Sequence, residues 1–187
     1  MTAPGEGEFK IVFTGPMGAG KTTAIAAISE VEPVRTEVDN SDRENHEKEY
    51  TTVGFDFGRI TLPGGHPVRL YGTPGQARFR FMWSILGRGA AGVIILLDAT
   101  RADALEQLDL FVDAFLPLVP SGAIVVGIGR NAEPGAVATD AFATRMEARG
   151  LVAPVLTIDA REPRDVRLLV HTLTCILESR VPAGACA

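Results

Sequence analysis

Short apolar runs alternate along the chain with longer segments in which apolar residues recur at spacings of three and four. The short runs are typical of buried strands, and the longer segments are typical of helices that cover a sheet. This alternation predicts an α/β fold, with helices on both faces of a mostly parallel sheet. Six strands are expected, at Phe9–Thr14, Thr52–Leu62, Pro67–Gly72, Ala91–Asp98, Ala123–Ile128 and Val155–Ile158. Five helices are expected, at Lys21–Val31, Ala77–Arg88, Asp103–Leu118, Thr139–Arg149 and Asp165–Arg180.

Two connections depart from the simple alternation. The second and third strands are separated only by Pro63-Gly64-Gly65-His66, which is hairpin length, so this pair is expected to be antiparallel. The connection over residues 32–50 is long and polar and cannot belong to the core. Two interpretations of it stay open, a solvated surface loop and a mobile loop that a ligand orders. Six acids follow Arg35 in it, namely Glu37, Asp39, Asp42, Glu44, Glu47 and Glu49.

The composition is that of an ordinary globular protein. The 187 residues are 46% hydrophobic and 22% charged, which suits one folded domain, expected over residues 8–180 with flexible ends at 1–7 and 181–187. A net charge of −5 lacks the basic surface that nucleic-acid binding requires. No secretory signal, transmembrane segment or lipid anchor is recognisable, and two cysteines are too few for a disulfide framework. We therefore expect a cytoplasmic protein.

The segment Gly15–Thr22 reads GPMGAGKT and matches the phosphate-binding pattern G-x-x-x-x-G-K-[ST] in full. It directly follows an expected strand and opens an expected helix, which is the context that this motif needs. Glycines let backbone N–H groups surround a phosphate, and a helix N-terminus and a lysine supply positive charge. The following threonine offers a hydroxyl to Mg²⁺. The residues expected to bind the phosphates are Gly15, Gly18, Ala19, Gly20, Lys21, Thr22 and Thr23.

With two further segments, the chain resembles the Ras-like small GTPases, a P-loop NTPase family with a three-layer α/β/α fold. One segment is Thr51–Gly58, after the acidic loop, and the other is Tyr71–Gln76, after the third strand. The resemblance is closest to the bacterial branch of MglA-like proteins and of the small GTP-binding proteins from actinobacterial conservon operons. It implies that Thr52 contacts Mg²⁺ and the γ-phosphate, that Gly75 gives the γ-phosphate a backbone N–H, and that Gln76 orients the attacking water. The acidic loop would then be a switch loop that the triphosphate orders.

The chain departs from the family pattern at the magnesium site. The usual D-x-x-G begins here with Gly72, which has no side chain to hold a magnesium-bound water. Asp56 and Asp98 are candidates for a substitute carboxylate. For Asp98, at the end of an expected strand, the alternative of a carboxylate that caps a loop stays open.

A second departure lies where the guanine signature N-K-x-D should follow the fifth strand. The chain reads Gly129–Glu133, GRNAE, and Ala132 cannot accept the N1 and N2 hydrogens of guanine. Asn131 or Glu133 would compensate in a displaced loop, and the Arg130 side chain would lie over the base. A plain surface turn is the alternative.

The last base loop of many relatives, Ser-Ala-Lys, is replaced by Asp159-Ala160-Arg161. By resemblance, the N–H of Ala160 would meet a purine oxygen. The nucleotide is therefore expected to be GTP or GDP, with ATP or ADP left open.

Basic and aromatic residues follow Gln76. Arg78 and Arg80 are candidates for an arginine that neutralises charge during hydrolysis, although both also fit ordinary surface positions. The aromatic stretch beside them fits either a partner-binding surface or a buried helix face. By resemblance, the partner would be a roadblock/LC7-type regulatory protein. The stretch comprises Phe79, Phe81, Met82 and Trp83.

The sequence thus favours a nucleotide-dependent molecular switch that hydrolyses GTP slowly with Mg²⁺. Gln76, Lys21 and Thr52 are its expected catalytic residues, and Thr22 and Thr52 its metal ligands. Two alternatives stay open. A small-molecule kinase or other ATP-binding P-loop protein would share the phosphate loop, and a nucleotide-bound scaffold would no longer cycle.

Overall fold

The computed structural model describes residues 9–32, 34–35, 55–119 and 122–180. Its strands are β1 (Phe9–Thr14), β2 (Val34–Arg35), β3 (Asp56–Thr61), β4 (Pro67–Gly72), β5 (Gly92–Asp98), β6 (Ile124–Gly129) and β7 (Val155–Thr157). Its α-helices are α1 (Lys21–Ile28), α2 (Arg80–Gly87), α3 (Ala104–Phe115), α4 (Thr139–Ala148) and α5 (Pro163–Arg180). Short 3₁₀ turns at Ala77–Phe79 (η1) and Leu116–Leu118 (η2) adjoin α2 and α3.

The strands form one sheet in the order β2-β3-β4-β1-β5-β6-β7. β1 pairs in parallel with both β4 and β5, and β6 pairs in parallel with β5 and β7. β3 runs antiparallel to β4, as the hairpin-length connection predicts, and the two-residue β2 pairs antiparallel with β3. The predicted α/β class with a mostly parallel sheet, one antiparallel strand and five helices is confirmed. The short β2 was not predicted.

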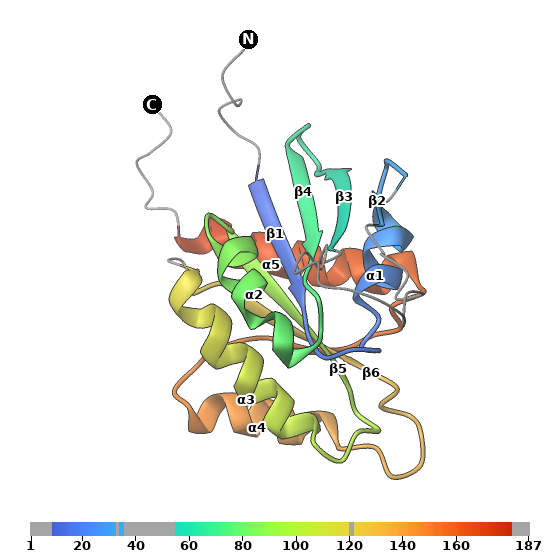
Figure 1. The fold of residues 1–187 in the computed structure, drawn as a ribbon, viewed down its shortest axis with the longest axis vertical. Coiled ribbons are helices and arrows are strands. Elements are labelled where there is room, and N and C mark those ends of the chain that lie inside the picture. Colours follow the sequence, from blue (N-terminus) through green and yellow to red (C-terminus); the bar gives the residue numbers. More distant parts are fainter. Residues whose placement is uncertain (1–8, 33, 36–54, 120–121, 181–187) are drawn as a thin grey trace, which may run out of the picture.

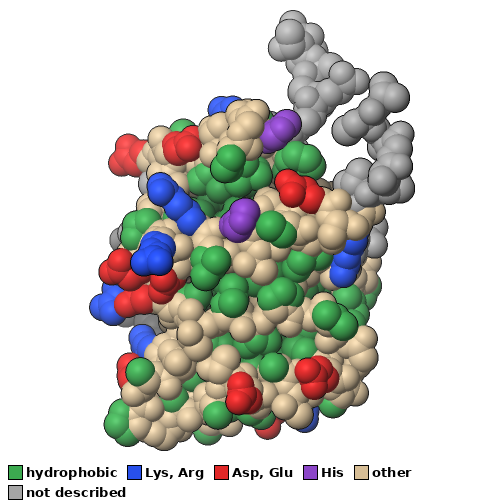
Figure 2. Space-filling model, turned by 180° about the vertical axis from the view of Figure 1, so that it is seen from behind, with side chains coloured by type: hydrophobic (Ala, Val, Ile, Leu, Met, Phe, Trp, Pro, Cys, Tyr) green, Lys and Arg blue, Asp and Glu red, His purple; other side chains and the backbone are tan. Residues whose placement is uncertain are grey.

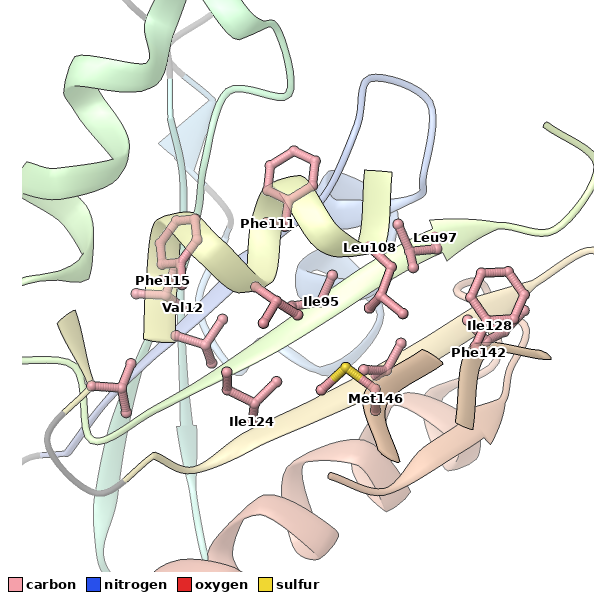
Figure 3. Close-up of a cluster of buried hydrophobic side chains, with 14 of the residues drawn as sticks. Val12, Ile95, Leu97, Leu108, Phe111, Phe115, Ile124, Ile128, Phe142 and Met146 are labelled. Atoms are coloured by element: carbon pink, nitrogen blue, oxygen red, sulfur yellow. The ribbon is translucent and has the colours of Figure 1, made fainter. Parts of the chain in front are cut away.

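Helices cover both faces of the sheet (Figure 1). On one face, α2, α3 and α4 pack over a cluster that includes Trp83, Phe111 and Phe142, and Figure 3 shows the α3 and α4 part of it. On the other face, α1 and α5 pack over a cluster that includes Phe13, Ile25 and Leu169. All seven residues of β5 are buried, because this strand lies centrally and has helices on both sides.

The ends of some elements differ from the prediction for local reasons. The first helix was expected to reach Val31, but α1 ends at Ile28 because Ser29 turns to an extended backbone with ψ 132°. The Ser29 hydroxyl accepts the N–H of Arg59 at 3.2 Å, which ties the chain to β3 instead of to another helical turn. The second expected strand begins at Asp56 within the described residues, and the predicted positions before Phe55 lie outside them.

None of the helices in the described part of the chain combines the length and the apolar composition that a membrane span requires.

Candidate functional site: a phosphate loop and an adjoining pocket

The loop between β1 and α1 is built around glycines. Gly15, Gly18 and Gly20 all have positive φ, at 139°, 82° and 90°. At Gly15 the space also demands glycine, since a Cβ there would lie 2.0 Å from the carbonyl oxygen of Leu96. The loop therefore keeps its N–H groups at the N-terminus of α1, where the helix dipole favours an anion.

Lys21 lies over this loop. Its side chain is buried, and its Nζ donates hydrogen bonds to the carbonyl oxygens of Gly15 at 2.8 Å and Pro16 at 2.7 Å. Burial lowers the pKa of Lys21 to about 8, against the nearby negative charge of Asp56, which raises it. A buried ammonium gains more from a bound phosphate than an exposed one, because water screens it less.

Thr22 and Asp56 bring a hydroxyl and a carboxylate together beside the loop. The Thr22 hydroxyl donates to Oδ2 of Asp56 at 2.6 Å. Asp56 faces Gly72 across the β3–β4 pair, and a Cβ on Gly72 would come within 2.8 Å of the same Oδ2. The absence of a side chain at 72 thus leaves the space that the Asp56 carboxylate fills.

A hydroxyl and a carboxylate suit Mg²⁺, which prefers hard oxygen ligands and keeps several waters. Across the residues that the structure describes, no group of three or more His, Cys, Asp or Glu side chains is arranged to hold a metal.

The loop after β4 rests directly on the phosphate loop. A Cβ on Gly75 would lie 2.4 Å from the backbone nitrogen of Met17 and 2.8 Å from Nζ of Lys21. The Gln76 amide nitrogen donates to the Met17 sulfur at 3.5 Å. At the bases of the two loops, the hydroxyls of Thr14, which ends β1, and Thr73, which follows β4, share a buried hydrogen bond of 2.8 Å. Any group bound at the phosphate loop therefore borders Gly75 and Gln76.

The residues after Gln76 divide between core and surface. Trp83 is buried against Phe111 and Phe115, and its indole N–H donates to the carbonyl oxygen of Pro74 at 2.7 Å. Phe81 is 57% exposed. The buried-face alternative thus holds for Trp83, whereas Phe81 lies on the surface. Arg78 and Arg80 are exposed and lie over the rings of Phe79 and Trp83.

A pocket of about 650 Å³ opens next to the phosphate loop, at the carboxyl ends of β5 and β6. This edge is where open α/β sheets bind ligands. The lining includes nine residues that the sequence predicts for nucleotide binding, namely Gly18, Ala19, Gly20, Thr23, Arg130, Asn131, Asp159, Ala160 and Arg161. It also includes Glu133, which the sequence offers as an alternative base ligand. The residues outside that prediction are Leu97, Asp98, Gly129, Ala132, Thr157, Ile158 and Asp165.

The other predicted site residues lie at the phosphate loop or outside the described residues. Gly15, Lys21 and Thr22 form the phosphate loop, with Gly75 and Gln76 against it. Thr52 lies outside the described residues. Asp98, named as a metal candidate, points instead to the pocket, where it accepts a hydrogen bond from Arg130 at 2.9 Å.

A second hollow, a groove of about 780 Å³, lies at the opposite end of β1. Phe9, Ile28, His66, His171 and Leu177 are among the residues that line it. The face seen from behind in Figure 2 shows apolar side chains with charged groups and histidines among them. The groove is separate from the phosphate loop, which follows the other end of β1.

The sheet order and the phosphate loop have the architecture of the P-loop NTPase fold. The chain is moreover homologous, at modest identity, to small GTP-binding proteins of the Ras and Rab type. It is 29% identical over 131 residues to "GTP-binding protein ypt4" of Schizosaccharomyces pombe, an alignment that covers 66% of this chain and 51% of that protein.

Two Arabidopsis thaliana proteins are also similar. "Ras-related protein RABA1h" is 23% identical over 128 residues, covering 67% of this chain and 53% of the relative. "Ras-related protein RABA5b" is 31% identical over 103 residues, covering 54% and 42%. The chain thus spans about half the length of the curated relatives it matches. No family model matches the chain.

Proposed function

We propose that the protein is a small GTP-binding protein that acts as a nucleotide-dependent switch and hydrolyses GTP slowly with Mg²⁺. The homology to small GTP-binding proteins supports the class. The observation that carries the proposal is the closeness of residue 75 to the phosphate loop, where a Cβ on Gly75 would lie 2.4 Å from the backbone nitrogen of Met17 and 2.8 Å from Nζ of Lys21. A γ-phosphate held by Lys21 would meet the backbone of Gly75, so its arrival or loss would move that loop.

In this proposal, separate residues of the chain bind the nucleotide and promote its hydrolysis. The phosphate loop and Lys21 bind the β- and γ-phosphates, and Gln76 orients the attacking water. Thr22 and Asp56 would hold the metal with its water, and by the resemblance Thr52, which follows the acidic loop in the sequence, would complete the site. Magnesium, when bound, neutralises charge that develops on the phosphate oxygens. Asp56 thereby replaces the carboxylate that the family pattern places at residue 72, which the space beside Gly72 supports.

A partner that distinguishes the two nucleotide states would bind the surface next to Gln76. Phe81 and Ile85 on α2 are each 57% exposed, and α2 is tied to the loop after β4 through the Trp83–Pro74 hydrogen bond. Exposed apolar side chains beside a nucleotide-sensitive loop suit a protein partner. The resemblance to MglA-like bacterial proteins favours a roadblock/LC7-type regulator, in the cytoplasm.

The switch is tested with Trp83, the single tryptophan of the chain. Its N–H bond to Pro74, one residue before Gly75, makes its fluorescence a reporter of the loop. Replacing bound GDP by a non-hydrolysable GTP analogue should change the emission. Unchanged emission, with both nucleotides shown to bind, would contradict the switch.

Hydrolysis is tested with Gln76→Leu. This variant should keep the nucleotide affinity and the fluorescence change, and single-turnover hydrolysis should slow by about tenfold or more. Gln107→Leu, on α3, is the matched control and should hydrolyse GTP like the wild type. Release of phosphate to water supports the proposal. Transfer to an added small-molecule acceptor would identify a kinase, and permanent retention of triphosphate would identify a scaffold.

A further inference from the structure

Two arginines at the rim of the pocket are held by carboxylates. Arg130 follows β6 with a positive φ of 54°, and its Nη1 donates to Oδ2 of Asp98 at 2.9 Å. Asp98 is itself fixed, because its Oδ1 accepts the N–H and the hydroxyl of Thr100 at 3.0 and 2.6 Å. The Arg130 side chain remains 58% exposed. Its guanidinium is therefore anchored at one nitrogen, while more than half of the side chain stays accessible.

Arg161 is arranged in a similar way on the other loop. Its Nε and Nη2 donate to the Asp159 carboxylate, at 2.9 and 2.6 Å, and the N–H of Asp159 donates to Asp165 at 2.9 Å. The Arg161 side chain is 80% exposed. A planar guanidinium stacks on the π face of any nucleobase, whichever groups the base carries on its edge.

Recognition of guanine by its edge needs a different group, an acceptor for the N1 and N2 hydrogens. Ala132 offers only a methyl group on the loop after β6. Among the carboxylates that line the pocket, Asp98 and Asp159 are hydrogen-bonded to arginines, and Asp165 accepts a backbone N–H. Asn131 and Glu133 also line the pocket, but both are exposed, so the Asn131 amide and the Glu133 carboxylate stay hydrated. The described pocket thus carries stacking groups in place of a dedicated guanine acceptor.

We propose that this site binds purine nucleotides by stacking on Arg130 and Arg161 and discriminates little between guanine and adenine. The inference rests on the proposed nucleotide-binding function and specifies its substrate class. GTP and ATP should bind with dissociation constants within about tenfold of each other. CTP, whose smaller ring stacks less, should bind more weakly than both by about fivefold or more.

The test is calorimetric titration of the full chain with the magnesium complexes of GTP, ATP and CTP. Comparable binding of GTP and ATP, with weaker CTP, is the expected result. A GTP preference above about 100-fold over ATP would overturn the inference and leave the switch intact. Failure of all three nucleotides to bind would overturn the proposed function as well.

Ala132→Asp adds an acceptor for the N1 and N2 hydrogens of guanine. It therefore tests whether the lack of this acceptor is why the site discriminates little between guanine and adenine. This variant should bind GTP about tenfold more tightly, while ATP affinity stays the same or falls, since a carboxylate accepts both edge hydrogens of guanine. Equal effects on GTP and ATP would contradict this account of the pocket.

Arg130→Ala tests the stacking itself. It should weaken GTP and ATP by the same factor, about fivefold or more, because the π face is common to both bases. Arg88→Ala, an exposed arginine after α2 and outside the pocket lining, is the matched control and should change neither. Selective loss of one purine would show that Arg130 reads a base edge and would overturn the proposal.

Discussion

Asp56 and Gly72 form a complementary pair at the scale of single residues. They face each other across the β3–β4 hairpin, and the carboxylate of one occupies the space that a side chain on the other would need. The Asp56 carboxylate lies 2.6 Å from the Thr22 hydroxyl, so it stands beside the residue expected to ligate the metal. In the proposed metal site, a carboxylate from β3 would thus take the place of one from the neighbouring strand β4.

Asp56→Asn tests the role of this carboxylate. Asparagine keeps the shape and one acceptor but loses the charge, so the Mg²⁺ concentration for half-maximal GTP binding should rise by about tenfold or more. The measurement is a magnesium titration of GTP binding at fixed nucleotide. Asp140→Asn, at the exposed start of α4, should leave that concentration unchanged. An unchanged value in Asp56→Asn would remove Asp56 from the metal site.

The sequence could name residues of the site where a local motif encodes them. The phosphate loop was predictable because its spacing, its flanking strand and its helix all lie within one short segment. The sequence could not predict which of Asp56 and Asp98 lies beside Thr22. That depends on the register of the hairpin and on the direction of each side chain. The contact between Gln76 and Met17 was missed for the same reason, since the two residues are 59 positions apart.

At the scale of elements, the predicted bounds are right where burial in the core imposes a regular apolar pattern. They are wrong where a single local contact ends a helix or strand. β1 and β4 have the predicted bounds because their alternating or continuous apolar pattern is set by the core. The two-residue β2 has no period to detect. The last turn of the third expected helix becomes the 3₁₀ turn η2, which contains Pro117.

An ion-paired cluster joins α3 to α4. Asp109 accepts Nε of Arg145 at 2.9 Å and Nη1 of Arg149 at 3.1 Å, and Asp113 accepts another nitrogen of Arg149. The hydrogen bond from Arg145 is the main reason that the pKa of Asp109 lies below its ordinary value. The ionised carboxylate is therefore favoured in the folded state relative to the unfolded chain.

Asp109→Asn should lower stability in a pH-dependent way. Because the folded pKa is depressed, the contribution of Asp109 is present above its unfolded pKa of about 4 and is lost as pH falls through the folded value. Its size at pH 7 should be of the order of 0.5 kcal/mol, since these side chains are partly screened by water. Urea unfolding at pH 7 and near pH 3 measures it. A difference from the wild type that grows on acidification would contradict this sign.

At the scale of the whole molecule, the fold brings distant segments to one edge of the sheet. The phosphate loop, the loop after β4 and the loops after β6 and β7 all follow carboxyl ends of parallel strands that lie side by side. Packing on both faces fixes those ends, and the loops are left to bind ligand. This division explains why the fold class was predictable from periodicity, whereas the identity of the base depends on individual loop side chains.

Ligand binding should therefore be visible in the stability of the entire chain. A nucleotide that binds only the folded state, at 100 times its dissociation constant, stabilises it by about 2.7 kcal/mol, which corresponds to a rise in Tm of roughly 5–10 °C for a chain of this size. Thermal unfolding with Mg²⁺ should show comparable rises with GTP and ATP. Lys21→Met removes the buried ammonium while keeping the length of the side chain, so at the same nucleotide concentration most of the rise should disappear. A rise that persists in Lys21→Met would mean that the nucleotide binds elsewhere than the phosphate loop, because that loop would then lack its main positive charge.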